Sequence, residues 1–217
     1  MTTAPRPNLS DRSFGADTVA FARHAWAGLR VLLVLTVLLG VVYPLAVTGV
    51  SQLTMRWQAN GSLVDASGSR VTSTDDAVGS LLVGQSFDGA QWFHPRPSAA
   101  GDGYDTLASA GSNLGPLNTD LLATVRERRA SVAATEGVSP AKVPADAVTA
   151  SGSGLDPDIS PAYAELQVPR VARERGVSAD EVRALVERTT TGRDLGVLGE
   201  PRVDVLRLNL ALQTMGS

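Results

Sequence analysis

Side chains that could perform covalent or acid–base chemistry are few in this chain. It has no cysteine, one lysine (Lys142) and two histidines, which excludes thiolate nucleophiles, disulfides and Cys-based metal sites. His24 precedes a long apolar run, so His94, beside Pro95, is the only imidazole base in the rest of the chain. The sequence contains no phosphate-binding G-x-x-x-x-G-K-[ST] loop, no H-E-x-x-H helix and no G-x-S-x-G turn. We therefore predict no catalytic residues.

One acidic run, Asp156-Pro157-Asp158, offers the oxygen ligands that a calcium ion prefers. The same pattern is typical of a turn in which each Asp side chain accepts hydrogen bonds from nearby backbone N–H groups. We favour the turn and predict no metal site.

Charge is distributed unevenly along the chain. Residues 1–30 have a net charge of +2, whereas residues 51–217 contain fifteen basic and twenty acidic residues, a net charge of −5. Nucleic-acid binding needs a basic surface. The acidic part of the chain is therefore a poor candidate for a nucleic-acid partner.

A long apolar run from Val31 to Val50 contains twenty residues without a charge. At about 1.5 Å of rise per residue, a helix of this length crosses the roughly 30 Å core of a bilayer. Trp26 and Trp57 lie on either side of the run, as interfacial residues do. The run is longer than the apolar core of a signal peptide, and no A-x-A-like site follows it. We therefore predict a single membrane anchor.

Arginines near this run indicate its orientation. Arg12, Arg23 and Arg30 precede it, whereas only Arg56 and Arg70 follow within a similar distance. The positive-inside rule then places the N-terminus in the cytoplasm. The absence of cysteine suits an extracytoplasmic domain. We predict a cytoplasmic disordered tail (1–25), a transmembrane helix with interfacial flanks (26–57) and an extracytoplasmic soluble domain (58–217) at a bacterial plasma membrane.

Small residues recur every four positions within the predicted membrane helix, at Thr36, Gly40, Pro44 and Thr48. This spacing places them on one face, where a second helix could approach closely. Glycine and proline are also simply frequent in membrane helices, and that alternative stays open. Pro44 lacks an N–H group and is expected to kink the helix.

The soluble part contains two long stretches rich in Gly, Ser, Pro, Asp and Asn, at residues 94–118 and 151–160. Loops of this length are uncommon in a compact domain unless they have a function or are disordered. Residues 59–80 predict a loop or weak strands, and residues 81–87 form a short apolar run typical of a strand.

Helices are expected between and after these loops. Residues 119–135 have helical periodicity, Ser160-Pro161 is a strong helix start, and residues 178–181 form a capping box. Alternating leucines at residues 203–210 predict a strand. The expected fold is therefore a single N-terminal transmembrane helix followed by a small mixed α/β (α+β) extracytoplasmic domain.

Six short strings in the soluble part are distinctive together. In this order, behind one membrane helix, they closely resemble the C subunits of the bacterial Kdp potassium-transporting ATPases, from about residue 30 to the C-terminus. Asp204 stands where this family usually has Asn, and Ala110 stands where a Gly is common. The strings are Gly84–Phe87, Arg96–Ala99, Gly111–Pro116, Thr149–Pro157, Gln167–Ala172 and Gly199–Val203.

The resemblance implies an accessory subunit of an ATP-driven, high-affinity potassium uptake complex, without catalytic residues of its own. Its partners would be a channel-like subunit that selects potassium and a P-type subunit that hydrolyses ATP. The chain lacks the Asp-Lys-Thr-Gly run that P-type ATPases phosphorylate. ATP, Mg²⁺ and K⁺ would therefore be handled by the complex. The family's C subunit is described as stabilising the complex and as a catalytic chaperone that raises ATP affinity.

The loops at 94–118 and 151–160 match the family strings, and we expect them to form a docking surface for the potassium-selecting subunit. The candidate contact residues are Arg96, Asn113, Gly115, Asp156 and Arg170. The resemblance also points to nucleotide contact near Gln167, although a buried or cap-satisfying glutamine is commoner. The alternative function is a membrane-anchored extracytoplasmic hydrolase or binding protein with an unrecognised site, with His94 as its only candidate base.

Overall fold

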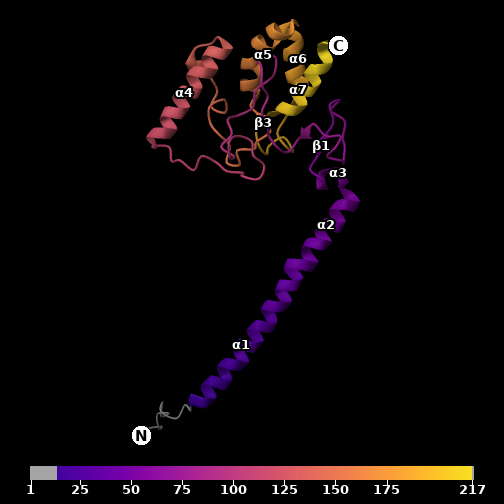
Figure 1. Ribbon diagram of the computed structural model, residues 1–217, viewed down its shortest axis with the longest axis vertical. Coiled ribbons are helices and arrows are strands. Elements are labelled where there is room, and N and C mark those ends of the chain that lie inside the picture. The colour runs from indigo at the N-terminus through magenta and orange to yellow at the C-terminus, as the bar shows by residue number, and fades with distance from the viewer. Residues whose placement is uncertain (1–13, 217) are drawn as a thin grey trace, which may run out of the picture. The chain divides into compact units, whose positions relative to one another are not determined.

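The computed structural model describes residues 14–216, which form two compact units that divide after Arg56. The first is a long helical segment and the second, from Trp57 onward, contains all the strands (Figure 1). This confirms one apolar N-terminal helix and a small mixed helix–strand domain. Residues 1–13 of the predicted disordered tail lie outside the described residues.

The apolar N-terminal segment consists of α1 (Phe14–Val37), a π-helical turn (Leu38–Val42) and α2 (Tyr43–Thr54). In residues 14–216, only Asp17–Thr54 is a helix long and apolar enough to cross a membrane. The helix begins at Phe14, so residues 14–25, predicted as part of the disordered tail, are helical. Arg30 lies over the ring of Trp26, 5.1 Å from its centroid.

Pro44 explains the π-helical turn. Proline has no N–H group to donate to the carbonyl four residues earlier, and its ring collides with that carbonyl in a regular helix. The chain widens instead, and Tyr43 N–H bonds to the carbonyl of Leu38, five residues back. The predicted disturbance at Pro44 is therefore a local π-turn.

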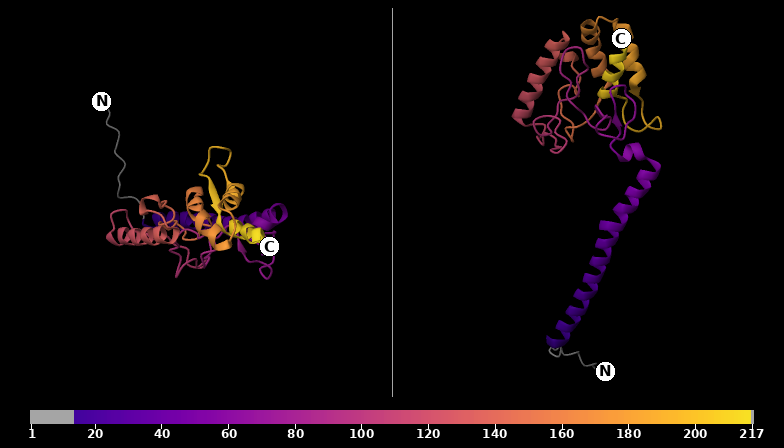
Figure 2. Two further views of the ribbon diagram at one scale, coloured as in Figure 1. Left: turned by 90° about the horizontal axis from the view of Figure 1, so that it is seen from above. Right: turned by 45° about the vertical axis from the view of Figure 1, so that its right-hand side comes forward.

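Five helices of four or more residues follow Met55 among the described residues, the first of which begins at Arg56, and the strands are two or three residues long. Figures 1 and 2 show how they are arranged. The helices are α3 (Arg56–Ala59), α4 (Thr119–Glu136), α5 (Pro161–Arg175), α6 (Ala179–Thr189) and α7 (Val205–Gln213), and the strands are β1 (Leu63–Val64), β2 (Gly79–Ser80), β3 (Asp158–Ile159), β4 (Thr190–Thr191) and β5 (Arg202–Asp204).

The three C-terminal strands form an antiparallel sheet in the order β3–β5–β4. Ile159 pairs with Val203, which also pairs with Thr190. Helices α5, α6 and α7 pack around this sheet, and Val203, Leu208 and Leu212 are fully buried. A second, two-stranded sheet joins β1 to β2.

Local helix signals in the sequence are confirmed. Ser160 Oγ accepts the Tyr163 N–H at the start of α5, and Ser178 and Glu181 form both hydrogen bonds of the capping box that begins α6. Helix α5 also passes through Pro169 without ending. Of the elements predicted from residue 59 to residue 87, only the weak strands at 63–64 and 79–80 form.

The predicted strand over residues 203–210 is wrong beyond Asp204. Asp204 Oδ1 accepts the Arg207 N–H and so caps α7, which begins at Val205. Val205, Leu208 and Leu212 are buried at helical spacing. The leucines satisfy both a strand and a helix period, and the cap decides between them.

Candidate functional site

Residues 89–98, here called the held segment, have no regular secondary structure, yet side chains from two helices bind their backbone. Asn209 of α7 accepts the Phe93 N–H at 2.9 Å and donates to the Phe93 carbonyl at 2.9 Å. Gln167 of α5 does the same for His94, at 2.7 and 3.1 Å. The two amides thus take the place of neighbouring strands, and Phe93 is fully buried.

Arg170 of α5 binds the start of the held segment. Its Nη1 donates to the carbonyls of Ala90 and Trp92, and its Nη2 donates to Gln167 Oε1 at 2.8 Å. Its Nε lies 2.9 Å from Oε1 of Glu136, on α4, and both side chains are only 2% exposed. Burial raises the pKa of Glu136, and the nearby Arg170 guanidinium opposes this shift.

Two predicted contact residues are therefore internal. Arg170, predicted to face a partner subunit, is 2% exposed, and its donors are used within the domain. Gln167, placed near a nucleotide by the resemblance, is fully buried, and both its amide atoms bond to His94. In this structure neither side chain has a surface to offer a ligand, because the fold uses both to hold residues 89–98.

The two long loops bind each other. Arg96 Nη1 lies 2.7 Å from Asp156 Oδ2, and Asp156 Oδ1 accepts the Asp158 N–H, as in the predicted turn. Ser98 Oγ donates to the Gly154 carbonyl at 2.7 Å, and Ser109 Oγ donates to the Ser153 carbonyl at 2.9 Å. Arg96 and Asp156 thus join the loops to each other, and both remain partly exposed.

Gly154 lies at the closest approach of the two loops. Its φ of +67° is in the left-handed region, and a Cβ there would lie 2.5 Å from the Ala110 carbonyl oxygen and 2.7 Å from the Ala100 nitrogen. Only glycine fits such a position without strain. The glycine-rich composition of residues 151–154 thus serves packing between the loops.

Residues 105–117, here called the outer loop, differ from the rest of the stretch. Leu107 and Leu117 are 97% and 90% exposed, and Leu114 is 42% exposed. Asn113 is exposed with a φ of +53°, and within residues 14–216 its side chain makes no hydrogen bond. Gly115 is also exposed, and no atom lies within 4 Å of the position of an added Cβ. The outer loop therefore offers apolar and polar surface that the domain does not use.

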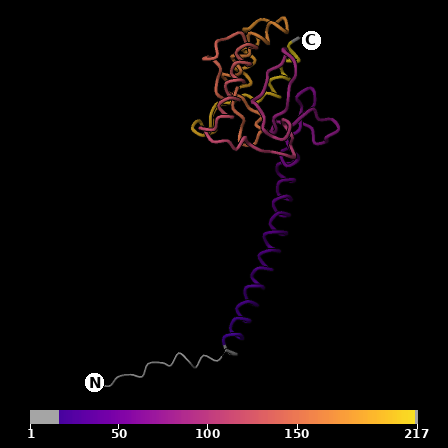
Figure 3. The backbone as a smooth tube through the Cα atoms, turned by 60° about the vertical axis from the view of Figure 1, so that its left-hand side comes forward, coloured from indigo at the N-terminus to yellow at the C-terminus, as the bar shows by residue number. Residues whose placement is uncertain are grey.

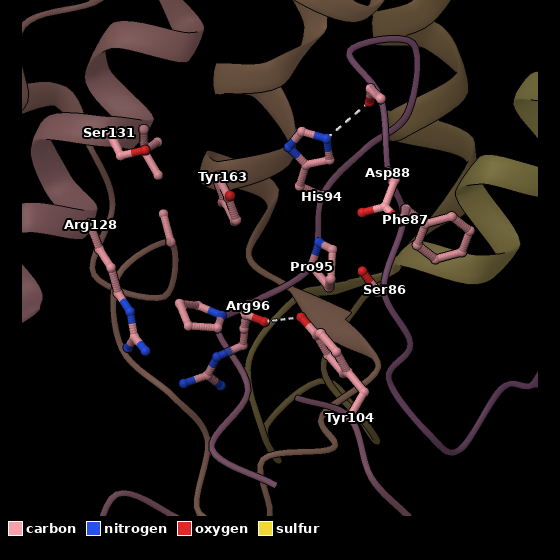
Figure 4. A pocket seen from close by; sticks show the side chains of 14 residues that line it. Ser86, Phe87, Asp88, His94, Pro95, Arg96, Tyr104, Arg128, Ser131 and Tyr163 are labelled. Carbon is pink, nitrogen blue, oxygen red and sulfur yellow. Dashed lines mark hydrogen bonds between the residues drawn. The ribbon is translucent and has the colours of Figure 1, made fainter. Parts of the chain in front are cut away.

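A pocket of about 410 Å³ lies beside the held segment, and Figure 4 shows side chains that line it, among them His94, Ser131 and Tyr163. The His94 ring pairs with the Gly89 carbonyl at 3.0 Å, and burial lowers the pKa of this histidine. Burial raises the pKa of Tyr104 to about 12, and its hydroxyl donates to the Arg96 carbonyl. Among the residues that the structure describes, no serine or carboxylate bonds to the His94 ring, so the pocket assembles no nucleophile–base pair.

Among the described residues, no group of three or more His, Asp or Glu side chains is placed to hold a metal ion. In the membrane helix, Thr36, Gly40, Pro44 and Thr48 all lie exposed within their own unit. No atom lies within 4 Å of a Cβ placed on Gly40.

Comparison with known proteins identifies the family. The family model described as "K+-transporting ATPase, c chain" (KdpC) matches residues 25–214. The chain belongs to the KdpC family. It is 57% identical over 192 residues to the potassium-transporting ATPase KdpC subunit of Kineococcus radiotolerans, covering 88% of this chain and 94% of that protein. It is 53% identical over 195 residues to the KdpC subunit of Mycobacterium tuberculosis H37Rv, covering 89% and 99%.

Several residues that build this KdpC site were not predicted from the sequence. Asn209 binds the held segment and Glu136 binds Arg170. Asn209 lies in the stretch predicted as a strand, and Glu136 lies just beyond the helix predicted at residues 119–135. One signal was available for Asn209, since it stands between Leu208 and Leu210 in an apolar run. A polar side chain at a buried helical position predicts a specific hydrogen-bond partner.

Proposed function

We propose that this chain is a non-catalytic accessory subunit of an ATP-driven potassium uptake complex, and that the outer loop docks onto the potassium-selecting subunit. The observation that supports this most strongly is the exposure of Leu107 and Leu117 on a loop that Ser109 bonds to the facing loop. Apolar side chains presented this way are typical of interaction surfaces. The family supplies the complex, since its relatives are named as subunits of a potassium-transporting ATPase.

The pocket at His94 supports an accessory role, because its histidine is bonded to a backbone carbonyl. We infer that ATP, Mg²⁺ and K⁺ are bound by the partner subunits. A catalytic-chaperone role then acts through contact between subunits, since Gln167 has both its amide atoms bonded to His94. This indirect route predicts that Gln167 affects ATP affinity only through the stability of the held segment.

The docking surface is tested by replacing Leu107 and Leu117 together with serine in the co-expressed complex. We expect unchanged thermal stability of the isolated chain and weaker recovery of the partner subunits in mild detergent. Leu195, which is 90% exposed on the loop between β4 and β5, is the control. The left view of Figure 2 shows this loop at the top. If Leu195→Ser reduced recovery of the partner subunits equally, the loop between β4 and β5 would also have to be part of the docking surface. Normal recovery of the Leu107/Leu117 variant would refute the proposal.

We further propose a cytoplasmic N-terminus and an extracytoplasmic domain, on the arginine distribution around the anchor. The chain has no cysteine, so a single Thr106→Cys substitution provides a unique label site on the exposed outer loop. An impermeant thiol reagent should label this cysteine in intact cells. Labelling only after the cells are opened would reverse the topology.

The small-residue face of the membrane helix is proposed to pack on a partner subunit. The Gly40→Leu change places a bulky side chain on a face that is open in the isolated chain. Interhelical contacts of this kind contribute about 1–2 kcal/mol. The variant should insert normally but dissociate from the complex more easily in detergent, and unchanged assembly would exclude this face.

A further inference from the structure

A second pocket, of about 530 Å³, is formed by Trp57, the loop after β1 and helix α7. Val64, Leu81 and Leu210 give it apolar walls, and Arg70 and Arg207 also line it. The Arg70 guanidinium lies 4.4 Å from the centroid of the Trp57 ring. The site thus combines two cationic groups with an aromatic and aliphatic lining.

The charges around this pocket favour an anion. Among residues 14–216, neither Arg70 nor Arg207 forms a salt bridge, and both arginines are exposed. The carboxylate of Asp65, on the same loop as Arg70, already accepts hydrogen bonds from the Ser67 and Ser69 N–H groups. Asp158 and Asp204 both attract Arg207, but neither carboxylate forms a salt bridge with it within the described residues, and Asp158 pairs with Arg202 instead. Guanidinium groups without a carboxylate partner are suited to phosphate.

Covalent connection keeps Trp57 close to the end of the apolar helix. Trp57 follows Thr54, the last residue of α2, by three positions, a distance of at most about 10 Å of extended chain. Its indole Nε1 donates to the Leu63 carbonyl at 2.7 Å, so the ring is fixed to the soluble unit. This wall of the pocket therefore stays near the end of the span, where tryptophan and arginine meet lipid headgroups.

We propose that Arg70, Arg207 and Trp57 form a binding site for the phosphate group of an anionic membrane phospholipid. The arginines bind the phosphate oxygens, and the glycerol and upper acyl carbons lie against Trp57 and Leu81. The proposal rests on the membrane anchor, but it does not depend on the partner subunits or on the docking surface.

The test uses the full chain in a neutral detergent, titrated with phosphatidylglycerol or phosphatidylcholine and observed by native mass spectrometry. We expect one saturable site that prefers phosphatidylglycerol. Replacing Arg70 and Arg207 with glutamine should weaken this binding about fivefold for each arginine. The matched control is Arg126→Gln with Arg188→Gln, which removes the same charge from exposed helix positions that form no salt bridge within the described residues.

Each remaining outcome overturns the proposal. Equal weakening by the control pair would mean nonspecific charge attraction, and equal binding of the two lipids would mean that no anionic site exists. Inorganic phosphate is added as a competitor. If it displaced the lipid and bound as tightly as phosphatidylglycerol, the pocket would be a site for soluble phosphate. Thermal unfolding checks both double variants, and the single Arg207→Gln change gives the same comparison if the double variant is unstable.

Discussion

The held segment and the outer loop are close in sequence and both lack regular secondary structure, but their surroundings are opposite. Side chains of Gln167, Arg170 and Asn209 bind the backbone of the held segment. The outer loop has one hydrogen bond from Ser109 to the facing loop, and it exposes its leucines. Figure 3 traces the backbone of both segments as part of the tube. Glycine-, serine- and proline-rich composition therefore does not distinguish a folded scaffold from a contact surface. The two are distinguished by the number of hydrogen bonds that side chains from distant helices form with the backbone.

The largest expected effect is on the held segment. Arg170→Met removes the bonds to the carbonyls of Ala90 and Trp92 and leaves Glu136 buried without its partner. Removing one member of a buried ion pair costs about 3–5 kcal/mol. Urea unfolding of the chain in detergent, followed by circular dichroism, measures this loss of unfolding free energy.

Two matched changes test the cause of that loss. Arg173→Met, at an exposed position of the same helix, should change stability by less than about 0.5 kcal/mol. Adding Glu136→Leu to Arg170→Met should recover part of the loss, because no unpaired charge remains. A loss below about 1 kcal/mol for Arg170→Met alone would show that residues 89–98 need no such anchor.

A pair of glycines provides the next comparison. Gly154→Ala forces a left-handed residue against the backbone of Ala110 and Ala100, and we expect a loss of about 2–4 kcal/mol in unfolding free energy. Gly115→Ala, in the outer loop, meets no neighbouring atom and should change stability by less than about 0.5 kcal/mol. Thermal unfolding of the two variants in parallel measures the difference. If Gly154→Ala and Gly115→Ala lowered the unfolding free energy by similar amounts, the packed loops and the outer loop would not differ as proposed.

The free energy of unfolding is expected to depend on pH through Asp204. Asp204 lies opposite Asp158 in the β3–β5 pair, and Asp158 belongs to the loop at residues 151–160. Burial raises the pKa of Asp204 to about 6. Because this value is above the ordinary 3.8, the folded state retains the proton longer than the unfolded state, and stability falls as pH rises through about 6. Asp204→Asn removes this loss and can still cap α7.

The Asp204→Asn variant should therefore match the parent near about pH 4 and exceed it by about 1–2 kcal/mol near about pH 7.5. Urea unfolding at both pH values measures this gain. The control Asp76→Asn, at an exposed loop position, should retain the parent's pH profile. A parallel pH profile for Asp204→Asn and the parent would show that this carboxyl does not link proton binding to folding.

Local signals in the sequence predicted local structure well. The capping box at Ser178 and the N-cap at Ser160 fix helix starts through contacts three residues apart, so a short window contains them. The alternating leucines at residues 206–210 were misleading because they fit both a strand and a helix period, and the cap at Asp204 decided the outcome. The bond between Asn209 and Phe93 spans 116 residues, and no local pattern contains it.

The same limit explains the site. The strings identified the family, but they did not distinguish Arg170 from Asn113 as predicted contact residues. Only the packing of α4 against α5 shows that Arg170 binds Glu136 inside the domain, while Asn113 remains exposed. Whether a residue of a family string is buried in the domain or exposed on its surface therefore depends on tertiary packing.

The smallest stability effect is expected in the outer loop, at Asn113. Its φ of +53° is tolerated by asparagine and glycine but costs alanine about 1 kcal/mol. Asn113→Gly thus removes the side chain without backbone strain, whereas Asn113→Ala removes the same group and adds strain. We expect Asn113→Gly to change the unfolding free energy by less than about 0.5 kcal/mol.

Recovery of the complex then separates the two roles of Asn113. If its amide contacts the potassium-selecting subunit, Asn113→Gly and Asn113→Ala should reduce recovery alike, although only the alanine variant is less stable. If asparagine is present only for its backbone conformation, the glycine variant should assemble like the parent, and the alanine variant should lose complex in proportion to its unfolded fraction. The second result would leave the exposed leucines of the outer loop as the only contacts proposed for this surface, because Arg96 already bonds to Asp156 within the domain.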